Sequence, residues 1–168
     1  MSQLFYTKPS HWDWNRALPV GNGRLGAMIY GEGSHEHFQL NEDSVWFGKK
    51  RERNNPDALA NLDKIRKLIL AGNIPQAEEL CKYALAGTPQ SQHSYQTLGD
   101  VYFDYCGALK ESRHFRRTLD LATAIHTSTI TDVSTSVEYK EETFVSRHYN
   151  CIVARFSASE KGKLDLAA

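Results

Sequence analysis

The stretch Ile152-Val153-Ala154-Arg155-Phe156-Ser157-Ala158 decides the class of fold, because its side chains divide into two alternating sets. Successive side chains of a β-strand face opposite ways, so the residues at 152, 154, 156 and 158 share one face of a strand. The same period of two recurs in Val101-Tyr102-Phe103-Asp104-Tyr105, and similar segments cover residues 115–121, 124–131 and 136–145. Antiparallel strands that bury one face need a second layer. The sequence therefore predicts a mainly β fold, an antiparallel β-sandwich.

Shorter strands are expected on both sides of this half. Towards the amino terminus, Pro19 and glycines at 21, 23 and 26 precede an apolar run at 26–30, and further runs cover 36–40 and 44–47. At the other end, residues 163–168 begin a new alternating strand after a turn at 160–162. Because no polar tail follows this strand, we expect the native chain to continue beyond Ala168.

Helical signals are confined to the stretch between these two sets of strands. Asn55 can cap a helix, Pro56 suits the first helical position, and apolar residues at 59, 62, 65, 68 and 69 follow at helical spacing. Gly72 is suited to end this helix, and Pro75 to begin a second, shorter one. The sequence therefore predicts a helical hairpin, over about 56–86, inserted into the β-sandwich.

The charge balance excludes two classes of partner. Lys and Arg number 20, Asp and Glu also number 20, and the formal net charge is zero. Such a chain has no global positive field with which to hold a phosphate backbone or an anionic membrane surface. The apolar runs are too short to span a bilayer, and the first residues do not have the pattern of a signal peptide. We expect neither nucleic acid nor membrane as a partner.

The three cysteines, Cys81, Cys106 and Cys151, are odd in number and widely spaced. This spacing argues against a disulfide framework and against a structural zinc site. We interpret them as reduced, mostly buried thiols, and we expect a cytoplasmic location.

Gly21-Asn22-Gly23-Arg24-Leu25-Gly26 matches the glycine pattern of dinucleotide-binding folds. In those folds a strand precedes the pattern, and a helix follows whose amino terminus holds the pyrophosphate. Here Pro19 precedes it and a β-like run follows, so we interpret the glycines as a tight turn that feeds a strand.

Asn41-Glu42-Asp43-Ser44-Val45-Trp46 places two carboxylates beside an indole, a combination that sugar-binding sites use. The two carboxylates could also serve as acid and base. Neighbours in a strand point to opposite faces, however, so Glu42 and Asp43 are poorly placed to flank one glycosidic bond. A structural or interface role is favoured.

Other polar and aromatic clusters have plainer interpretations. His35 and His37 could begin a metal site, but no third ligand has a suitable spacing, so a solvated strand face is favoured. The arginines at 113, 116 and 117 are interpreted as a charged strand face rather than an anion site. The aromatic residues at 95, 102, 103 and 105 are interpreted as core and packing surface rather than as a stacking platform.

Five short stretches of the chain follow one another in the order of known motifs. Ala17-Leu18-Pro19-Val20-Gly21-Asn22-Gly23-Arg24-Leu25-Gly26-Ala27-Met28 is the first, and Gln39-Leu40-Asn41-Glu42-Asp43-Ser44-Val45-Trp46 is the second. They resemble the opening signatures of family 95 glycoside hydrolases, enzymes of the α-L-fucosidase type. Residues 53–58, 95–100 and 116–121 are similar to later motifs of that family, so the resemblance covers nearly the whole chain.

The resemblance implies a domain organisation and a reaction. Enzymes of this family are several times longer, with a β-rich amino-terminal super-sandwich, a helical linker, an (α/α)6 barrel and a final β domain. Residues 1–168 would be the amino-terminal domain of such an inverting fucosidase. There a glutamic acid protonates the leaving oxygen, and asparagines supported by an aspartate activate a water. These groups would lie in the downstream barrel, so no catalytic residue, metal or cofactor is assigned here, and the chain alone is expected to be inactive.

The motifs leave one candidate surface within the chain. The residues that we expect to contact the downstream barrel, or to approach its substrate, are Asn22, Arg24, Asn41, Glu42, Asp43 and Trp46. The expected partners are the barrel itself and, through the full-length enzyme, a fucosylated oligosaccharide. A free-standing carbohydrate-binding module and a protein-interaction module remain as alternatives, and the preference between fucose and L-galactose is open.

Overall fold

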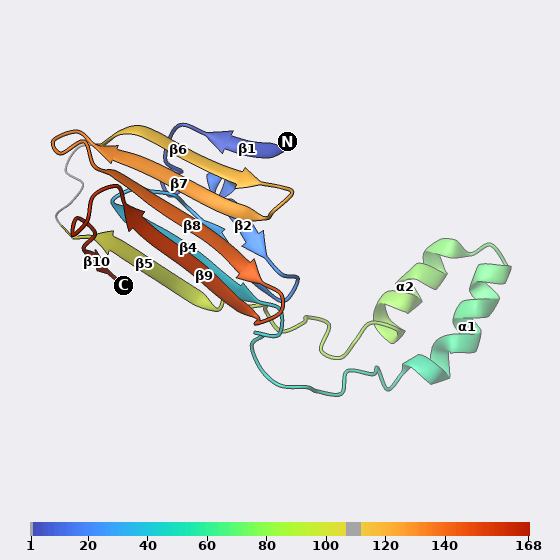
Figure 1. The fold of residues 1–168 in the computed structure, drawn as a ribbon. Coiled ribbons are helices and arrows are strands. Elements are labelled where there is room, and N and C mark those ends of the chain that lie inside the picture. The colour runs from blue at the N-terminus through green and yellow to red at the C-terminus, as the bar shows by residue number, and fades with distance from the viewer. Residues whose placement is uncertain (1, 107–111) are drawn as a thin grey trace. The chain divides into compact units, whose positions relative to one another are not determined.

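The computed structural model describes residues 2–106 and 112–168, and the chain divides into two compact units. The first unit combines residues 1–45 with residues 96–168, and the second comprises residues 46–95. The first unit is built on β-strands, and the second holds two helices (Figure 1). Each unit is described by itself.

Two antiparallel sheets make up the first unit, and they lie as two layers in Figure 1. One sheet has the order β1-β6-β7-β8-β9 and the other the order β10-β5-β4-β3-β2. The predicted antiparallel β-sandwich is therefore confirmed. A short 3-10 helix, η1 (Trp14–Arg16), precedes β2, and the strands are β1 (Gln3–Tyr6), β2 (Leu18–Gly21), β3 (Leu25–Ile29), β4 (His35–Glu42), β5 (Gly99–Tyr105), β6 (Ser112–Asp120), β7 (Ile125–Asp132), β8 (Glu138–Ser146), β9 (Cys151–Ala158) and β10 (Leu166–Ala167).

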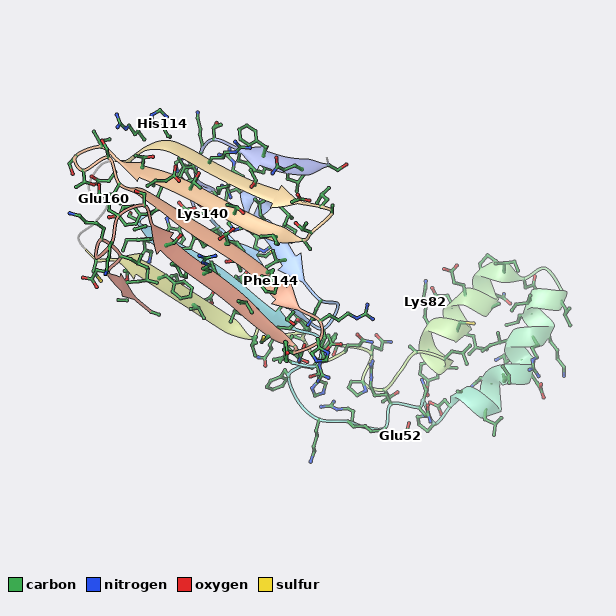
Figure 2. The ribbon with its side chains drawn as sticks, in the orientation of Figure 1. Glu52, Lys82, His114, Lys140, Phe144 and Glu160 are labelled. Atoms are coloured by element: carbon green, nitrogen blue, oxygen red, sulfur yellow. The ribbon has the colours of Figure 1, made fainter. Side chains whose placement is uncertain are left out.

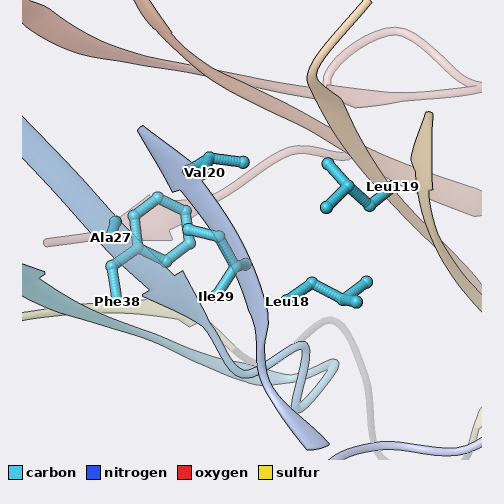
Figure 3. Close-up of a cluster of buried hydrophobic side chains, with 6 residues drawn as sticks. All are labelled: Leu18, Val20, Ala27, Ile29, Phe38 and Leu119. Carbon is cyan, nitrogen blue, oxygen red and sulfur yellow. The ribbon is translucent and has the colours of Figure 1, made fainter. Parts of the chain in front are cut away.

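The hydrophobic core lies between the two sheets and takes side chains from both (Figure 3). The face predicted at 152, 154 and 156 packs onto this core from β9, so the alternation of that stretch is confirmed. On β8, Lys140 and Phe144 lie on the opposite, outer face, between buried neighbours (Figure 2). Burial of such apolar area is the main term that holds two sheets together. The buried members of the cluster are Leu18, Val20, Ala27, Ile29, Phe38 and Leu119.

Two predicted strands are shorter than expected. Residues 44–47 do not continue β4; the chain turns after Glu42, and only Trp46 forms an isolated bridge, to Tyr95. The strand predicted at 163–168 is reduced to Leu166–Ala167, which pairs with the end of β5. A turn at Asp43 and Ser44 ends the first ladder, and residues 163–165 form no assigned secondary structure before the second begins.

The second unit contains the predicted helical hairpin, formed by α1 (Ala58–Leu70) and α2 (Ile74–Ala84). Gly72, with a φ of 78°, follows α1 as predicted. The prediction for the start of α1 is wrong, since the helix begins at Ala58 rather than Pro56. The side chain of Asn55 instead accepts a hydrogen bond from the Asp57 amide at 2.9 Å and donates to two carbonyls at the end of α2.

Neither helix in the described part of the chain is long and apolar enough to cross a membrane. The cysteines are free thiols, but the prediction that they are mostly buried is wrong. Cys106, just after β5, is exposed, and Cys81 and Cys151 are partly exposed. All three lie on a helix surface or at a strand end, where the core does not reach.

Arg117 corrects a second prediction, because this arginine is fully buried rather than part of a charged strand face. Arg117 lies two residues from Phe115 and two from Leu119, both of which pack in the core, so the alternation of β6 turns Arg117 inward as well. Its guanidinium donates to the carbonyl oxygens of Lys8 at 3.1 Å, Arg16 at 2.9 Å and Tyr30 at 2.8 Å. A buried cation must find such acceptors.

Glu36 is a second charged residue inside the sandwich. It lies on β4, and its Oε1 accepts hydrogen bonds from the amides of Gly31 at 2.6 Å and His37 at 3.0 Å. Glu141, on β8 of the other sheet, is also buried and accepts a 2.6 Å hydrogen bond from the Thr143 hydroxyl. Burial first, and the charge of Glu141 second, raise the pKa of Glu36 well above its usual value of 4.5.

This raised pKa makes stability depend on pH in a defined direction. When a carboxyl group has a higher pKa in the folded than in the unfolded state, its contribution to stability is present below the unfolded pKa. The contribution is lost as the pH rises through the folded pKa. Glu36 therefore lowers the stability of the sandwich as the pH rises above about 4.5.

We predict that Glu36→Gln raises the melting temperature at about pH 8, because a neutral amide keeps the acceptor oxygen and has no charge to desolvate. The shift should be roughly 2–4 °C for each kcal/mol gained, and it should narrow towards pH 4.5. Thermal melts monitored by circular dichroism across this pH range measure it. Glu138→Gln, at an exposed position of β8, is the control and should leave the pH dependence unchanged. A Glu36→Gln protein that melts at or below the unmodified chain at pH 8 would contradict the prediction.

Candidate functional site

Asn22 forms the turn between β2 and β3. Its side-chain Oδ1 accepts hydrogen bonds from the backbone amides of Arg24 at 2.9 Å and Leu25 at 2.8 Å. The backbone N–H of Asn22 donates to the Leu25 carbonyl. Gly23 has a φ of 94°, which suits a residue without Cβ. The glycine pattern thus makes a tight turn that feeds a strand, as predicted, and a strand rather than a helix follows it.

The amide group of Asn22 also reaches the other sheet. Its Nδ2 donates to the Ser146 carbonyl at 3.0 Å and to Oδ1 of Asn150 at 2.9 Å. Ser146 ends β8, and Asn150 lies in the turn that leads into β9. One side chain therefore holds the β2–β3 turn closed and joins the two sheets at this end of the sandwich.

Arg24, two residues after Asn22, forms ion pairs with residues at the end of β4. Its Nε lies 2.9 Å from Oε1 of Glu42 and 3.8 Å from Oδ1 of Asp43. The second oxygen of Glu42 accepts hydrogen bonds from the amide of Ser44 at 2.9 Å and from its hydroxyl at 2.5 Å. The Asp43 amide donates to the Arg24 carbonyl at 3.0 Å.

This geometry corrects the expectation that Glu42 and Asp43 point to opposite faces. β4 ends at Glu42, and Asp43 lies in the turn that follows, so the alternation of a strand no longer applies. Both carboxylates approach the same guanidinium. We name Arg24, Glu42, Asp43 and Ser44 the Arg24 cluster.

The Arg24 cluster keeps Glu42 ionised. The hydrogen bond from the Ser44 hydroxyl, and then that from Arg24, lower the pKa of Glu42 to about 2. A general acid for glycoside hydrolysis must instead hold a proton near neutral pH, which requires a raised pKa. Glu42 is therefore unsuited to protonate a leaving group, and its bonds fix the turn after β4.

The other two candidates occupy different surroundings. Asn41 lies on β4 opposite Gly26 of β3, one residue before the Arg24 cluster. Trp46 belongs to the second unit, where its ring meets Tyr95 edge to face with centroids 5.3 Å apart. It is 48% exposed and lines a cavity of about 380 Å³ together with Phe47 and His93. The structure thus brings Arg24, Glu42 and Asp43 together and places Trp46 in a separate unit.

Sequence reasoning missed two of the partners that complete this site. Ser44 stands two residues after Glu42, and a serine so close to a carboxylate is a signal for a local hydrogen bond. Asn150 gives no such signal, because 128 residues separate it from Asn22. Only the pairing of the sheets brings the two asparagines together.

His35 and His37 each pair with an aspartate of β5. Within residues 2–106 and 112–168, no group of three or more histidine, cysteine or acidic side chains is arranged to hold an ion. His35 pairs with Asp104, and His37 Nε2 lies 2.7 Å from Oδ1 of Asp100. The predicted solvated face is wrong for His37, which is buried.

The chain is similar to glycoside hydrolase sequences over nearly its whole length. Residues 4–168 match the family described as glycosyl hydrolase family 65, N-terminal domain. The chain is 33% identical over 165 residues to α-L-fucosidase 2 of Arabidopsis thaliana, covering 96% of this chain and 19% of that protein. It is 34% identical over 153 residues to probable α-fucosidase A of Aspergillus niger, covering 85% and 18% respectively.

The corresponding protein of Aspergillus oryzae is 32% identical over 136 residues, which cover 76% of this chain and 18% of that protein. The chain therefore spans about a fifth of the length of these curated relatives. The expected resemblance to an amino-terminal domain of α-L-fucosidase-type enzymes is confirmed, although the matching family carries the number 65 where the motifs indicated 95.

We predict that Asn22→Ala destabilises the sandwich by about 1–3 kcal/mol, because it removes hydrogen bonds within the turn and between the sheets. Urea unfolding followed by circular dichroism measures the change. Asn150→Ala removes only one of the four side-chain bonds of Asn22 and should cost clearly less. Equal losses in the two variants would show that the turn itself does not depend on Asn22.

Proposed function

Because the chain belongs to the family of glycosyl hydrolase family 65 N-terminal domains, we propose that it serves a longer enzyme as its non-catalytic amino-terminal β-sandwich. The observation that carries this proposal is the unequal coverage of the comparisons. The first relative aligns with nearly all of this chain, but with only 19% of its own length. A downstream catalytic domain, for which the motifs predict an (α/α)6 barrel, would supply the chemistry.

The reaction that we propose for the longer enzyme is the hydrolysis of α-L-fucosyl linkages. The names of the relatives from the plant and from the two fungi support this substrate class. Its mechanism would be the inverting one, with a carboxylic acid that protonates the leaving oxygen and a water activated on the opposite face. The natural substrate would be a fucosylated oligosaccharide.

The geometry of the Arg24 cluster supports a non-catalytic role for this chain. Glu42 is held by Arg24 and Ser44, and its lowered pKa leaves it without the proton that an acid catalyst needs. Asp43 shares the same guanidinium. Both carboxylates pair with the same arginine, so they do not stand on opposite sides of a glycosidic bond as an acid and a base must.

We further propose that Asn22, Arg24, Asn41, Glu42, Asp43 and Trp46 contact the downstream barrel or approach its active-site mouth. Arg24 and Asp43 combine a strongly exposed side chain with a geometry fixed by the turn. Fixed, exposed charges of both signs suit a polar contact between domains.

A protein-interaction module is the alternative from a different class. A groove of about 580 Å³ on the helical hairpin supports it, with Leu68, Leu80 and Tyr83 among its lining residues. Such a module would act without a barrel attached. Sequencing the transcript past Ala168 separates the alternatives, because an open frame of several hundred further codons is required by the enzyme proposal.

We predict that the 168-residue chain does not release 4-nitrophenol from 4-nitrophenyl α-L-fucoside above the buffer rate, whereas the longer protein does. Absorbance at matched molar concentrations measures both rates. Hydrolysis by the chain alone would overturn the non-catalytic role. A longer protein that cleaves other glycosides but not α-L-fucosides would overturn the substrate class and leave the domain role standing.

We predict that Trp46→Ala or Glu42→Gln in the longer protein lowers either its melting temperature or its kcat/KM several-fold, because a domain contact or a substrate approach is lost. Calorimetry and steady-state kinetics read the two effects separately. Trp14→Ala removes a similarly exposed indole outside the proposed set and is the control. Unchanged stability together with unchanged kinetics in both variants would reject the proposed contact.

A further inference from the structure

The outer face of the β10-β5-β4-β3-β2 sheet carries a group of rings that none of the roles above uses. Phe38 of β4 and Phe103 of β5 pack towards the core, so their neighbours in each strand face outward. His35 lies opposite Asp104, and His37 lies opposite Tyr102, in the register of β4 against β5. Two histidines, a tyrosine and an aspartate therefore share one patch of this face.

These rings form a continuous stack. The ring of His37 lies between those of Tyr30 and Tyr102, with centroid separations of 4.3 Å and 4.6 Å. His35 stacks on Tyr102 at 5.5 Å. The indole of Trp12 lies 5.7 Å from His35 and 5.5 Å from His37. We name Trp12, Tyr30, His35, His37 and Tyr102 the aromatic stack.

Aspartates hold the imidazoles in place. His35 bonds to Asp104, and His37 Nε2 lies 2.7 Å from Oδ1 of Asp100. Both aspartates lie on β5, on the outward face and on either side of Tyr102 in sequence. The stack is thus bordered by carboxylate oxygens in fixed positions.

The backbone at Trp12 adopts an unfavourable conformation. His11 and Trp12 have φ values of 55° and 60°, a conformation that non-glycine residues rarely adopt and that costs on the order of 1–3 kcal/mol each. Glu32 holds the loop by accepting hydrogen bonds from the Trp12 amide at 2.9 Å and from the Ser10 hydroxyl. These hydrogen bonds hold the loop in the conformation that exposes Trp12.

The stack is open to solvent at Trp12, His35 and Tyr102, which corrects the interpretation of Tyr102 as core. Trp12 is 52% exposed and Tyr102 is 43% exposed, whereas Tyr30 and His37 are buried. β10 pairs with β5 only at Asp104 and Tyr105, so Tyr102 lies at an open stretch of the sheet edge. Its ring stacks on both imidazoles.

We propose that the aromatic stack is a binding site for a neutral pyranose glycan. A pyranose presents an apolar C–H face, which suits an aromatic ring, and a rim of hydroxyls, which suits fixed carboxylates and imidazoles. The sugar ring lies on Trp12 or Tyr102, and its hydroxyls bond to Asp100, Asp104 or His35. The choice of ligand class rests on the proposed function, since a domain of a glycan-degrading enzyme meets such ligands at high local concentration.

A titration of the ¹⁵N-labelled 168-residue chain, followed by two-dimensional NMR, tests the site. The probes are L-fucose and 2′-fucosyllactose, and glycerol is the control for hydroxyls without a pyranose face. The expected result is a saturable shift of the Trp12 indole signal, with a dissociation constant on the order of 1 mM. The indole of Trp14, which is 54% exposed, should not shift.

Two variants and a matched control locate the binding. Trp12→Ala and Tyr102→Leu should each weaken the affinity at least tenfold, read on the backbone amides of β5, whereas Trp14→Ala should leave it unchanged. Tyr102→Leu keeps a side chain suited to a strand, so it serves if Trp12→Ala fails to fold.

The other outcomes overturn the proposal. They are no shift at millimolar sugar in a folded chain, equal shifts at the Trp12 and Trp14 indoles, and the same shifts with glycerol. Binding by the isolated chain that is lost in the longer protein would also overturn it, because the stack would then be a contact between domains. Hydrolysis of 4-nitrophenyl α-L-fucoside is proposed to occur elsewhere in the longer protein, so it reports on the proposed function independently.

Discussion

The guanidinium of Arg117 connects parts of the chain that share no strand pairing. It extends from β6 of one sheet and donates to the carbonyls of Lys8, Arg16 and Tyr30. Tyr30 directly follows β3 of the other sheet. At the next residue, Gly31, an added Cβ would lie 2.1 Å from the Arg117 Cδ. Because an unmet cation or carbonyl inside the sandwich is costly, this one side chain fixes the path of residues 8–16 across the sheets.

That path determines what the outer surface can offer. Arg117 bonds to Lys8 and Arg16 at the two ends of the loop that carries Trp12. It also bonds to the carbonyl of Tyr30, the residue on which His37 stacks. The hydrophobic core supplies most of the energy of association, but apolar burial has no direction. Polar side chains supply the direction: Arg117 positions the loop of the aromatic stack, and Asn22 joins the sheets at the β2–β3 turn.

The polar groups of the chain therefore fall into two sets. One set stabilises the fold, and the other remains exposed to solvent. Asn22 and the Arg24 cluster use their hydrogen-bonding capacity on neighbouring turns, and the low pKa of Glu42 expresses how completely that carboxylate is engaged. The aromatic stack differs, since Trp12, His35 and Tyr102 stay about half exposed beside oriented aspartates. The chain thus holds its fold with one set of polar residues and leaves a second set, the one proposed to bind a glycan, open at the surface.

The sequence by itself determined the β-sandwich, the helical hairpin and the tight turn at Gly21–Gly26, because strand alternation, helical spacing and glycine conformation are local properties. The residues and order of its short motifs also indicated the α-L-fucosidase-type enzymes to which it is similar. The expectation that charged residues stay on the surface failed at Arg117, which faces inward beside Leu119. Strand alternation failed where a turn brought Glu42 and Asp43 onto one arginine. The contacts of Asn22 with Asn150, and of Trp12 with His37, join residues distant in sequence. Only the tertiary structure decided them, since the register of paired strands and the packing of two sheets set which distant side chains meet.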